Sequence, residues 1–340
     1  MNHNEALLAD WRTLAQRLQE EVRRAVIGQD RIIELITTAI FARGHVLLEG
    51  DVGVGKTTIL RAFARAIGGA FARVEGTVDL LPNDLLYYTY IAADGKPRVD
   101  PGPLLQHEDR LSVFFFNEVN RARPQVHSLL LRAMAEKSAF AFIREYHFPH
   151  LTVFADRNRV EKEETFEISS AARDRFMFEL QVETPQDIET QRALVFDPRF
   201  HDVDALLGNV AEAMLPHAEL NAIGAQIQSG VRASAQLERY ALQLWQATRV
   251  PEQFGVQLDG VNMRQLLAAG ASPRGMSMLL RAARVTAWLD ARDYLTPEDI
   301  HAAFKPAIVH RVFLTPVYEL RRTEIVHELA TQILAKIAAP

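Results

Sequence analysis

The chain has 340 residues, of which 48% are hydrophobic and 24% are charged, and its formal net charge at pH 7 is −5. These values are typical of a soluble globular protein with room for two domains. The acidic balance excludes a global basic field that would attract nucleic acid or anionic lipid, although it leaves a local basic patch open. Because the sequence contains no cysteine, disulfides, thiolate nucleophiles and cysteine zinc sites are excluded as well.

The N-terminal stretch MNHNEALLADWR lacks a basic region followed by an apolar core, so it does not resemble a signal peptide. No apolar run approaches the length of a membrane span. We therefore expect a cytoplasmic protein that has no membrane partner.

Helical and strand-like patterns alternate over the first half of the chain. The apolar spacing predicts an amphipathic helix from residue 5 to about 24 and a second helix over about 30–41. Five short apolar runs are predicted strands: HVLLEG (45–50), AFARVEG (70–76), LSVFFF (111–116), HLTVFA (150–155) and RFMFELQV (175–182). Helical stretches separate most of them, and this alternation predicts a parallel sheet.

Strand patterns stop beyond Pro185, and residues from about 203 to 340 are rich in Ala and Leu with helical periodicity. We therefore expect an α/β domain over 1–190 and a separate helical domain over 203–340. TPQD (184–187) and the loop around FDPRFHD would link them.

A glycine-rich stretch follows the first predicted strand. Residues 50–57, GDVGVGKT, match the phosphate-loop pattern G-x-x-x-x-G-K-[ST] at every specified position. The glycines let backbone N–H groups turn towards phosphate oxygens, and the N-terminus of the helix predicted next adds a positive end. Lys56 would reach the β- and γ-phosphates, and the Thr57 hydroxyl would bind Mg²⁺. The expected nucleotide contacts are Gly50, Asp51, Val52, Gly53, Val54, Gly55, Lys56, Thr57 and Thr58.

The strand LSVFFF ends in Asn117 and Glu118, where the ligand crevice of an open α/β sheet lies. In P-loop NTPases a second strand supplies an acid for the Mg²⁺ shell. Glu118 is placed to position and deprotonate an attacking water.

The chain resembles the AAA+ ATPases, and within them the MoxR family. The matching stretches are VIGQD (26–30), GHVLLEGDVGVGKT (44–57), RVEGTVDLLPND (73–84), DPGPL (100–104), NEVNRARPQVHSLLLRAMAE (117–136), ADRN (155–158), EISSAARDRF (167–176), GASPRGMSMLLRAARVTAW (270–288) and DYLTPEDI (293–300). The resemblance implies a five-stranded parallel sheet in the order 5-1-4-3-2, a C-terminal all-helical lid, and ATP bound between the subunits of a ring, typically a hexamer.

The resemblance also implies roles for single residues. Asn158 would be the polar sensor that helps to hold the attacking water, although an asparagine after a strand is often a turn residue. Arg175 would be the arginine finger offered to the neighbouring subunit, with Arg173 as a competitor. Arg274 would be the second sensor, reaching the γ-phosphate from the lid.

Two further stretches gain meaning from the resemblance. Residues 26–29, including Ile27 and Gly28, would lie near the adenine. LLYYTY (85–90) could be a binding surface, because family members carry an insertion hairpin near this position, but buried aromatic side chains would explain it equally well.

The family pattern at residues 117–118 is Asp-Glu, whereas this chain has Asn-Glu. Asn117 keeps an oxygen that can face Mg²⁺ or its bound water, but it loses a full negative charge and can also turn its NH₂ group towards the metal. We therefore expect weaker Mg²⁺ retention and slower turnover, while ATP binding through Lys56 and the loop amides is retained.

The leading hypothesis is an ATP-driven remodelling protein in which hydrolysis within the ring moves insertion loops against a client protein. Family members often act with a partner that contains a von Willebrand factor A domain. A second hypothesis is an ATP-responsive scaffold with negligible hydrolysis, because Asn117 replaces the acid. A third, a DNA-acting ATPase, is disfavoured by the acidic net charge and the lack of a nucleic-acid module.

Overall fold

The computed structural model describes residues 3–159 and 165–340. The chain divides into two compact units. The first, here called the sheet unit, comprises Thr13–Phe176 and Leu180–Asn221. The second, here called the helical unit, comprises the N-terminal residues up to Arg12, Met177–Glu179 and Ala222–Pro340.

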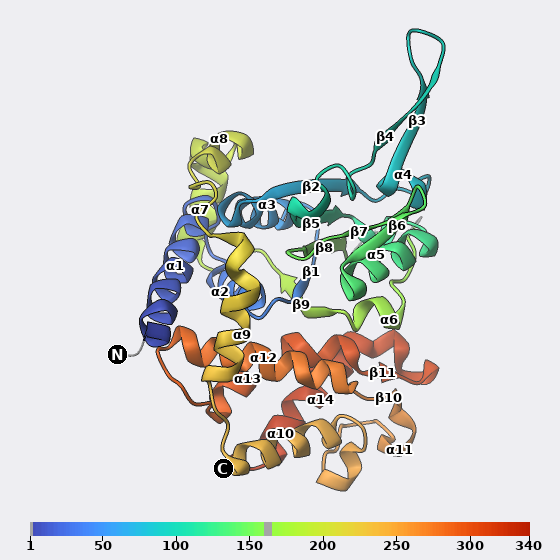
Figure 1. Cartoon of the computed structure of the whole chain (residues 1–340). Helices are drawn as coiled ribbons and strands as arrows, with labels where there is room; N and C mark the ends of the chain where they lie inside the picture. The colour runs from blue at the N-terminus through green and yellow to red at the C-terminus, as the bar shows by residue number, and fades with distance from the viewer. Residues whose placement is uncertain (1–2, 160–164) are drawn as a thin grey trace. The chain divides into compact units, whose positions relative to one another are not determined.

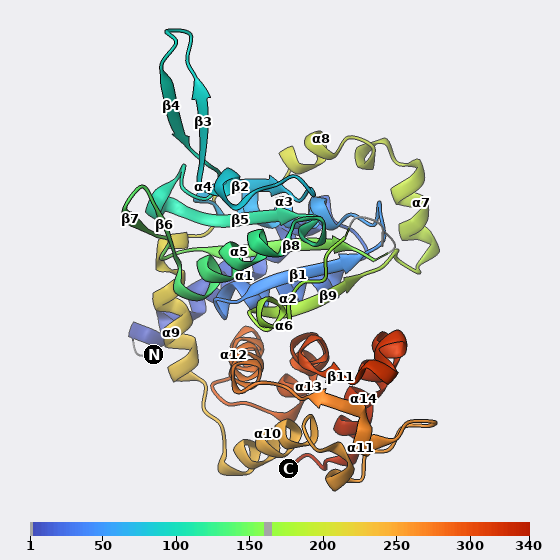
Figure 2. The same ribbon diagram turned by 90° about the vertical axis from the view of Figure 1, so that its right-hand side faces the viewer.

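The central sheet has five strands in the order β2-β5-β8-β1-β9 (Figure 2). They are β1 (His45–Gly50), β2 (Ala70–Glu75), β5 (Leu111–Asn117), β8 (Thr152–Asn158) and β9 (Phe176–Val182). The pairs β2–β5, β5–β8 and β8–β1 are parallel. Numbered in chain order within this sheet, the arrangement is 5-1-4-3-2, so the predicted fold class and strand order are confirmed.

Strand β5 lies at the centre of the packing, and all seven of its residues are buried, as expected of a strand covered on both faces. Phe114 and Phe116 share a core cluster with Val126 and Leu130 of α5 (Pro124–Glu136). Successive side chains of a strand point to opposite faces, so Phe115 faces the other side of the sheet. The strand ends at Asn117, which is itself buried.

Further helices complete the sheet unit: α1 (His3–Ala25), which begins in the helical unit, α2 (Asp30–Phe41), α3 (Lys56–Ile67), α4 (Pro82–Leu86), α6 (Ser170–Arg173), α7 (Ile188–Phe196) and α8 (Val203–Gly208). Helix α3 packs against β1, β5 and β8, and α2 packs against β1. The stretch TPQD precedes α7, whose N-terminus Asp187 caps by accepting a hydrogen bond from Thr190 N.

Two hairpins extend from the sheet unit. The first, β3 (Tyr87–Ile91) with β4 (Pro97–Pro101), projects away from the sheet (Figure 1). The second is β6 (Ser138–Ala141) with β7 (Arg144–His147). In LLYYTY only the two leucines are buried, whereas Tyr88 and Tyr90 are exposed on β3. Buried aromatic side chains therefore do not explain this stretch.

The helical unit contains α9 (Leu220–Gly230), which begins in the sheet unit, together with α10 (Ala235–Ala247), α11 (Met263–Leu266), α12 (Pro273–Leu289), α13 (Pro297–Ile308) and α14 (Arg322–Lys336). A short antiparallel pair, β10 (Leu267–Ala269) with β11 (Phe313–Leu314), departs from the all-helical expectation. Within the described part of the chain, no helix combines the length and apolar character needed to cross a membrane.

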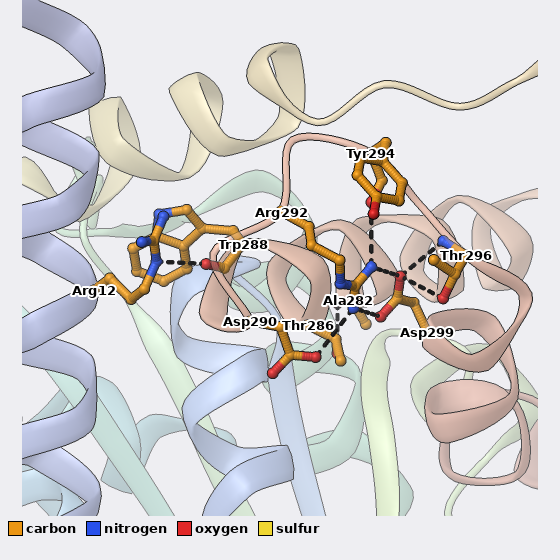
Figure 3. A network of polar contacts seen from close by, with 9 residues as sticks. All are labelled: Arg12, Ala282, Thr286, Trp288, Asp290, Arg292, Tyr294, Thr296 and Asp299. Carbon is orange, nitrogen blue, oxygen red and sulfur yellow. Dashed lines mark hydrogen bonds and ion pairs between the residues drawn. The ribbon is translucent and has the colours of Figure 1, made fainter. Parts of the chain in front are cut away.

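An ion pair between the partly buried Arg292 and the buried Asp299 joins the end of α12 to the start of α13 (Figure 3). The Arg292 guanidinium donates to both carboxylate oxygens of Asp299, at 2.7 and 2.6 Å, and to Asp290 at 3.0 Å. Asp299 also accepts from the Thr296 backbone N–H at 2.8 Å, which completes the N-cap of α13. The Asp299 side chain is only 2% exposed, and it accepts hydrogen bonds from both Arg292 and the N-terminus of α13.

We expect Asp299→Asn to destabilise the helical unit by about 2–4 kcal/mol, because it leaves the Arg292 charge partly buried without its main partner. Urea unfolding followed by tryptophan fluorescence would measure this, since Trp11, Trp245 and Trp288 all belong to the helical unit. The matched control is Asp293→Asn, which removes an exposed pair with Arg232 and should have a much smaller effect, because solvent screens exposed pairs. Equal effects of the two substitutions would contradict the importance of burial.

Candidate functional site

The loop after β1 has the backbone that a phosphate loop requires. Gly53 and Gly55 have φ values of +81° and +89°, a region that glycine adopts without steric cost. Gly55 immediately precedes α3, so the free N–H groups of the first helical turn face the loop. Gly50 has no room for a side chain, because a Cβ atom there would lie 2.3 Å from the carbonyl oxygen of Val182.

Lys56 lies inside this loop with only 6% exposure. Its Nζ donates to the carbonyl oxygens of Gly50 at 2.9 Å and Asp51 at 2.8 Å, and to Asn158 Oδ1 at 2.6 Å. A buried ammonium must be hydrogen-bonded, and three acceptors match its three N–H groups. A bound triphosphate would compete with these acceptors for the same ammonium.

Asn158 connects the loop to Glu118. It is the last residue of β8 and is paired in register with Gly50 of β1. While its Oδ1 accepts from Lys56, its Nδ2 donates to Glu118 Oε1 at 2.6 Å. Both ends of the amide are therefore used within the site, and the structure brings together Lys56, Asn158 and Glu118, three of the candidate site residues.

Glu118 has a left-handed backbone, with φ +53° and ψ +48°, which is uncommon for a residue other than glycine. Its N–H donates to Asp156 Oδ1 at 2.6 Å. Asp156 is 1% exposed, and burial raises its pKa to about 6, opposed by the Glu118 hydrogen bond and the Lys56 charge. The sequence analysis missed Asp156, although it lies within the matching stretch ADRN (155–158), of which only Asn158 was singled out.

Thr57 and Asn117 form the part of the site suited to Mg²⁺. Thr57 Oγ1 donates to Asn117 Oδ1 at 3.2 Å, so two neutral oxygens lie side by side. Among the described residues no cluster of three or more His, Asp or Glu side chains could hold a metal ion by itself. Nucleotide-bound Mg²⁺ usually takes only one or two protein ligands, with phosphates and waters completing its shell, and these residues fit that donor set.

A pocket of about 280 Å³ lies beside the loop. Its walls come from the turn before α2, from the loop, and from the α7–α8 region: Ala25, Val26, Ile27, Gln29, Gly53, Val54, Gly55, Thr58, Ile59, Thr184, Pro185, Leu194, Phe200, Val203 and Leu206. The pocket is largely apolar and suits a planar base. Ile27, a candidate adenine contact, is among the lining residues, whereas no motif in the sequence indicated Leu194 or Phe200.

Gly28 is not among the residues that line the pocket, although its neighbours Ile27 and Gln29 are. Its φ is +69°, and a Cβ atom there would come within 2.7 Å of Pro185. The next residue, Gln29, donates from Nε2 to the Glu183 carbonyl oxygen at 2.7 Å. The turn is thus held against the segment that follows β9.

Arg175 lies far from the phosphate loop of the same chain. It immediately precedes β9, and its Nη1 donates to the Ala171 carbonyl oxygen at 2.8 Å. The other end of β9, at Val182, contacts Gly50. Seven strand residues span roughly 20 Å, so Arg175 cannot reach its own phosphate loop. The competitor Arg173 is the last residue of α6, near the same end of β9.

Arg274 belongs to the helical unit. Ser272 caps α12 by accepting a hydrogen bond from Gly275 N at 3.0 Å, and Arg274 therefore lies in the first helical turn. A cation there is unfavourable with the helix dipole. Its role at the γ-phosphate stays a prediction.

A phosphate loop at the carboxyl end of a central strand, in a parallel sheet of this order, defines a P-loop nucleotide-binding domain. The family model described as "ATPase family associated with various cellular activities (AAA)" matches residues 45–178, and an "AAA lid domain" matches residues 262–333.

Known proteins resemble the chain over nearly its whole length. Protein MoxR of Methylorubrum extorquens is 57% identical over 99% of this chain and 98% of the relative. Chaperone MoxR1 of Mycobacterium tuberculosis is 32% identical over 99% and 85%, respectively. The crystal structure of a candidate ATPase from Cytophaga hutchinsonii superposes with a TM-score of 0.81 at 28% identity, covering 98% of this chain and 97% of the other. The chain belongs to the MoxR family of AAA+ ATPases.

We expect Asp156→Asn to stabilise the ligand-free protein increasingly as the pH rises. Asp156 would ionise near its ordinary pKa of 3.8 in the unfolded chain but only near 6 in the folded protein. The folded state therefore loses stability as the pH rises through this window, whereas asparagine does not titrate. About two pKa units correspond to about 3 kcal/mol, which is the upper limit of the gain between pH 4 and pH 7.

Urea unfolding followed by circular dichroism at a series of pH values would measure this gain as the difference between variant and parent. A difference that stays constant with pH would contradict the effect of burial on Asp156.

Proposed function

We propose that the protein binds Mg–ATP and hydrolyses it slowly in a ring of identical subunits, using the cycle to remodel or mature a client protein. The observation that carries the proposal is the bridge of Asn158 between Lys56 and Glu118. It connects the residue suited to bind the phosphates with the residue suited to accept a proton from water.

Each residue has a defined part in the proposed reaction. A water attacks the γ-phosphorus, the bond to the β-phosphate oxygen breaks, and ADP leaves. Glu118 orients the water and accepts its proton, while Asn158 holds the Glu118 carboxylate. Lys56 and the loop N–H groups bind the phosphate oxygens. Thr57 Oγ1 and Asn117 Oδ1 would hold a Mg²⁺ ion, which would supply positive charge beside the phosphates when bound.

The position of Arg175 supports a ring. Because it lies roughly 20 Å from its own loop along β9, it can act as an arginine finger only on a neighbouring subunit. Such a finger stabilises the charge of the transition state. Cyclic homo-oligomers bring the same two surfaces together at every interface, so each site would receive one Arg175. Arg274 would add a second cation from the lid.

Two observations support a client protein: the name of one relative and the exposed apolar side chains on the hairpins. The relative from Mycobacterium tuberculosis is named a chaperone. In this chain the hairpins carry exposed apolar side chains, among them Tyr88, Ile91, Phe140 and Ile143, which suit contact with a protein. A partner with a von Willebrand factor A domain and a hexameric ring are proposed on the family resemblance alone, and the cytoplasmic location stays a prediction from the sequence.

A second candidate function is an ATP-responsive scaffold with negligible hydrolysis. The observation that favours it is Asn117, which brings no charge to the Mg²⁺ side of the site. The scaffold would bind nucleotide and assemble as the motor does, so turnover separates the two.

We expect measurable steady-state ATP hydrolysis that Glu118→Gln abolishes, by at least about 100-fold, because the water loses its base. Nucleotide binding should persist in this variant and disappear in Lys56→Ala. A parent protein that binds ATP but turns over no faster than Glu118→Gln would favour the scaffold instead.

We expect Arg175→Ala to lose turnover by about 10³-fold and to regain it when mixed with Glu118→Gln. In mixed rings a Glu118→Gln subunit supplies Arg175 to the intact site of its Arg175→Ala neighbour, which happens at about a quarter of the interfaces in an equal random mixture. The control is Arg173→Ala in the same experiment. Rescue of Arg173→Ala but not of Arg175→Ala would transfer the role to Arg173.

A further inference from the structure

Asn117 has an acidic partner on the neighbouring strand. Glu75 is the last residue of β2, and it is paired in register with Asn117, the last residue of β5. The Asn117 Nδ2 group donates a hydrogen bond to Glu75 Oε1. The same asparagine accepts from Thr57 Oγ1 at 3.2 Å, so a chain of hydrogen bonds runs from Thr57 through Asn117 to Glu75.

This partner determines which end of the Asn117 amide faces the metal side. A carboxylate can only accept hydrogen bonds, so the amide atom that faces Glu75 must be the nitrogen. The oxygen then points the other way, towards Thr57. The sequence alone left open whether the NH₂ group would turn to the metal, and Glu75 removes that possibility.

Glu75 also brings negative charge to this edge of the sheet. Its second oxygen pairs with Arg73 at 3.1 Å, and its side chain is about half exposed. Its charge is nonetheless felt in the site, because it is one of the charges that raise the pKa of the buried Asp156. A carboxylate is therefore present one strand away from the position where the family pattern has aspartate.

We propose that Glu75 and Asn117 share the work of the single aspartate that the family pattern has at position 117. Asn117 supplies the oxygen beside Thr57, and Glu75 acts as a positioning residue that orients this oxygen and supplies the missing charge. The inference rests on the proposed binding of Mg–nucleotide at this site.

The pairing makes a specific demand on substitutions. Asn117→Asp alone removes the N–H donor between the two side chains and sets two carboxylates against each other. Glu75→Gln alone keeps an acceptor for Asn117 but removes the charge, and it lets either amide end face the other. The double variant, Glu75→Gln with Asn117→Asp, exchanges acid and amide across the strand pair and keeps one donor and one charge.

The test is a double-mutant cycle over the parent, the two single variants and the double variant. The readout is the binding of a fluorescent ADP analogue to the full chain over a range of Mg²⁺ concentrations, from which the Mg²⁺ midpoint is taken. We expect Glu75→Gln to raise the midpoint about tenfold. Asn117→Asp alone should bring no improvement, and the double variant should return to within about threefold of the parent.

Three controls make the outcome decisive. Thermal unfolding without nucleotide checks that each variant folds. Glu49→Gln removes a carboxylate from β1, a strand that is adjacent to neither β2 nor β5 and whose Glu49 pairs with Arg157 instead, and its midpoint should stay within about twofold of the parent. Lys56→Ala should bind no nucleotide at any Mg²⁺ concentration.

The outcomes separate the inference from the proposed function. If Lys56→Ala binds nucleotide as the parent does, the proposed site itself is wrong. If Lys56→Ala fails to bind but Glu75→Gln leaves the midpoint unchanged, only the shared role of Glu75 and Asn117 is overturned. The shared role of Glu75 and Asn117 is also overturned if Asn117→Asp lowers the Mg²⁺ midpoint equally in the parent and in the Glu75→Gln background.

Discussion

The buried ammonium of Lys56 is the constraint on which the site depends. A cation with so little exposure requires acceptors on every side, and two of them are carbonyl oxygens of its own loop. The third is Asn158, which reaches Lys56 only because β1 and β8 run parallel and end at the same level. The strand order, the glycine backbone of the loop and the start of α3 are thus all required by one charged group.

Around this cation the carboxylates lie on several strand ends rather than on one. Glu118 follows β5, Asp156 is on β8 and Glu75 ends β2. Each is held differently: Glu118 by Asn158, Asp156 by the Glu118 backbone, and Glu75 by Asn117 and Arg73. These three carboxylates outnumber the two cations beside them, Lys56 and Arg73, so the edge of the sheet is electrostatically suited to a further cation.

Much of this arrangement could be predicted from sequence because it depends on local patterns. The apolar runs mark the five strands, and the glycine spacing marks the phosphate loop with Lys56 and Thr57. The pairings of Asp156 with Glu118 and of Glu75 with Asn117 could not be predicted, because they depend on the register between strands distant in sequence. Leu194 and Phe200 could not be predicted for another reason. In a sequence, an apolar residue that lines a pocket cannot be distinguished from one that packs in a core.

The two-ended use of the Asn158 amide has a thermodynamic consequence. Lys56 and Glu118 are held by opposite ends of one rigid planar group, so their positions are linked equilibria. An anion that draws the Lys56 ammonium away from Asn158 frees the amide to rotate, and it thereby changes the restraint on the Glu118 carboxylate. By reciprocity, the factor by which the bound anion changes the equilibrium of the Asn158–Glu118 hydrogen bond equals the factor by which breaking that hydrogen bond changes the affinity for the anion. Through Asn158, the position of the Glu118 carboxylate therefore depends on whether the phosphate loop is occupied.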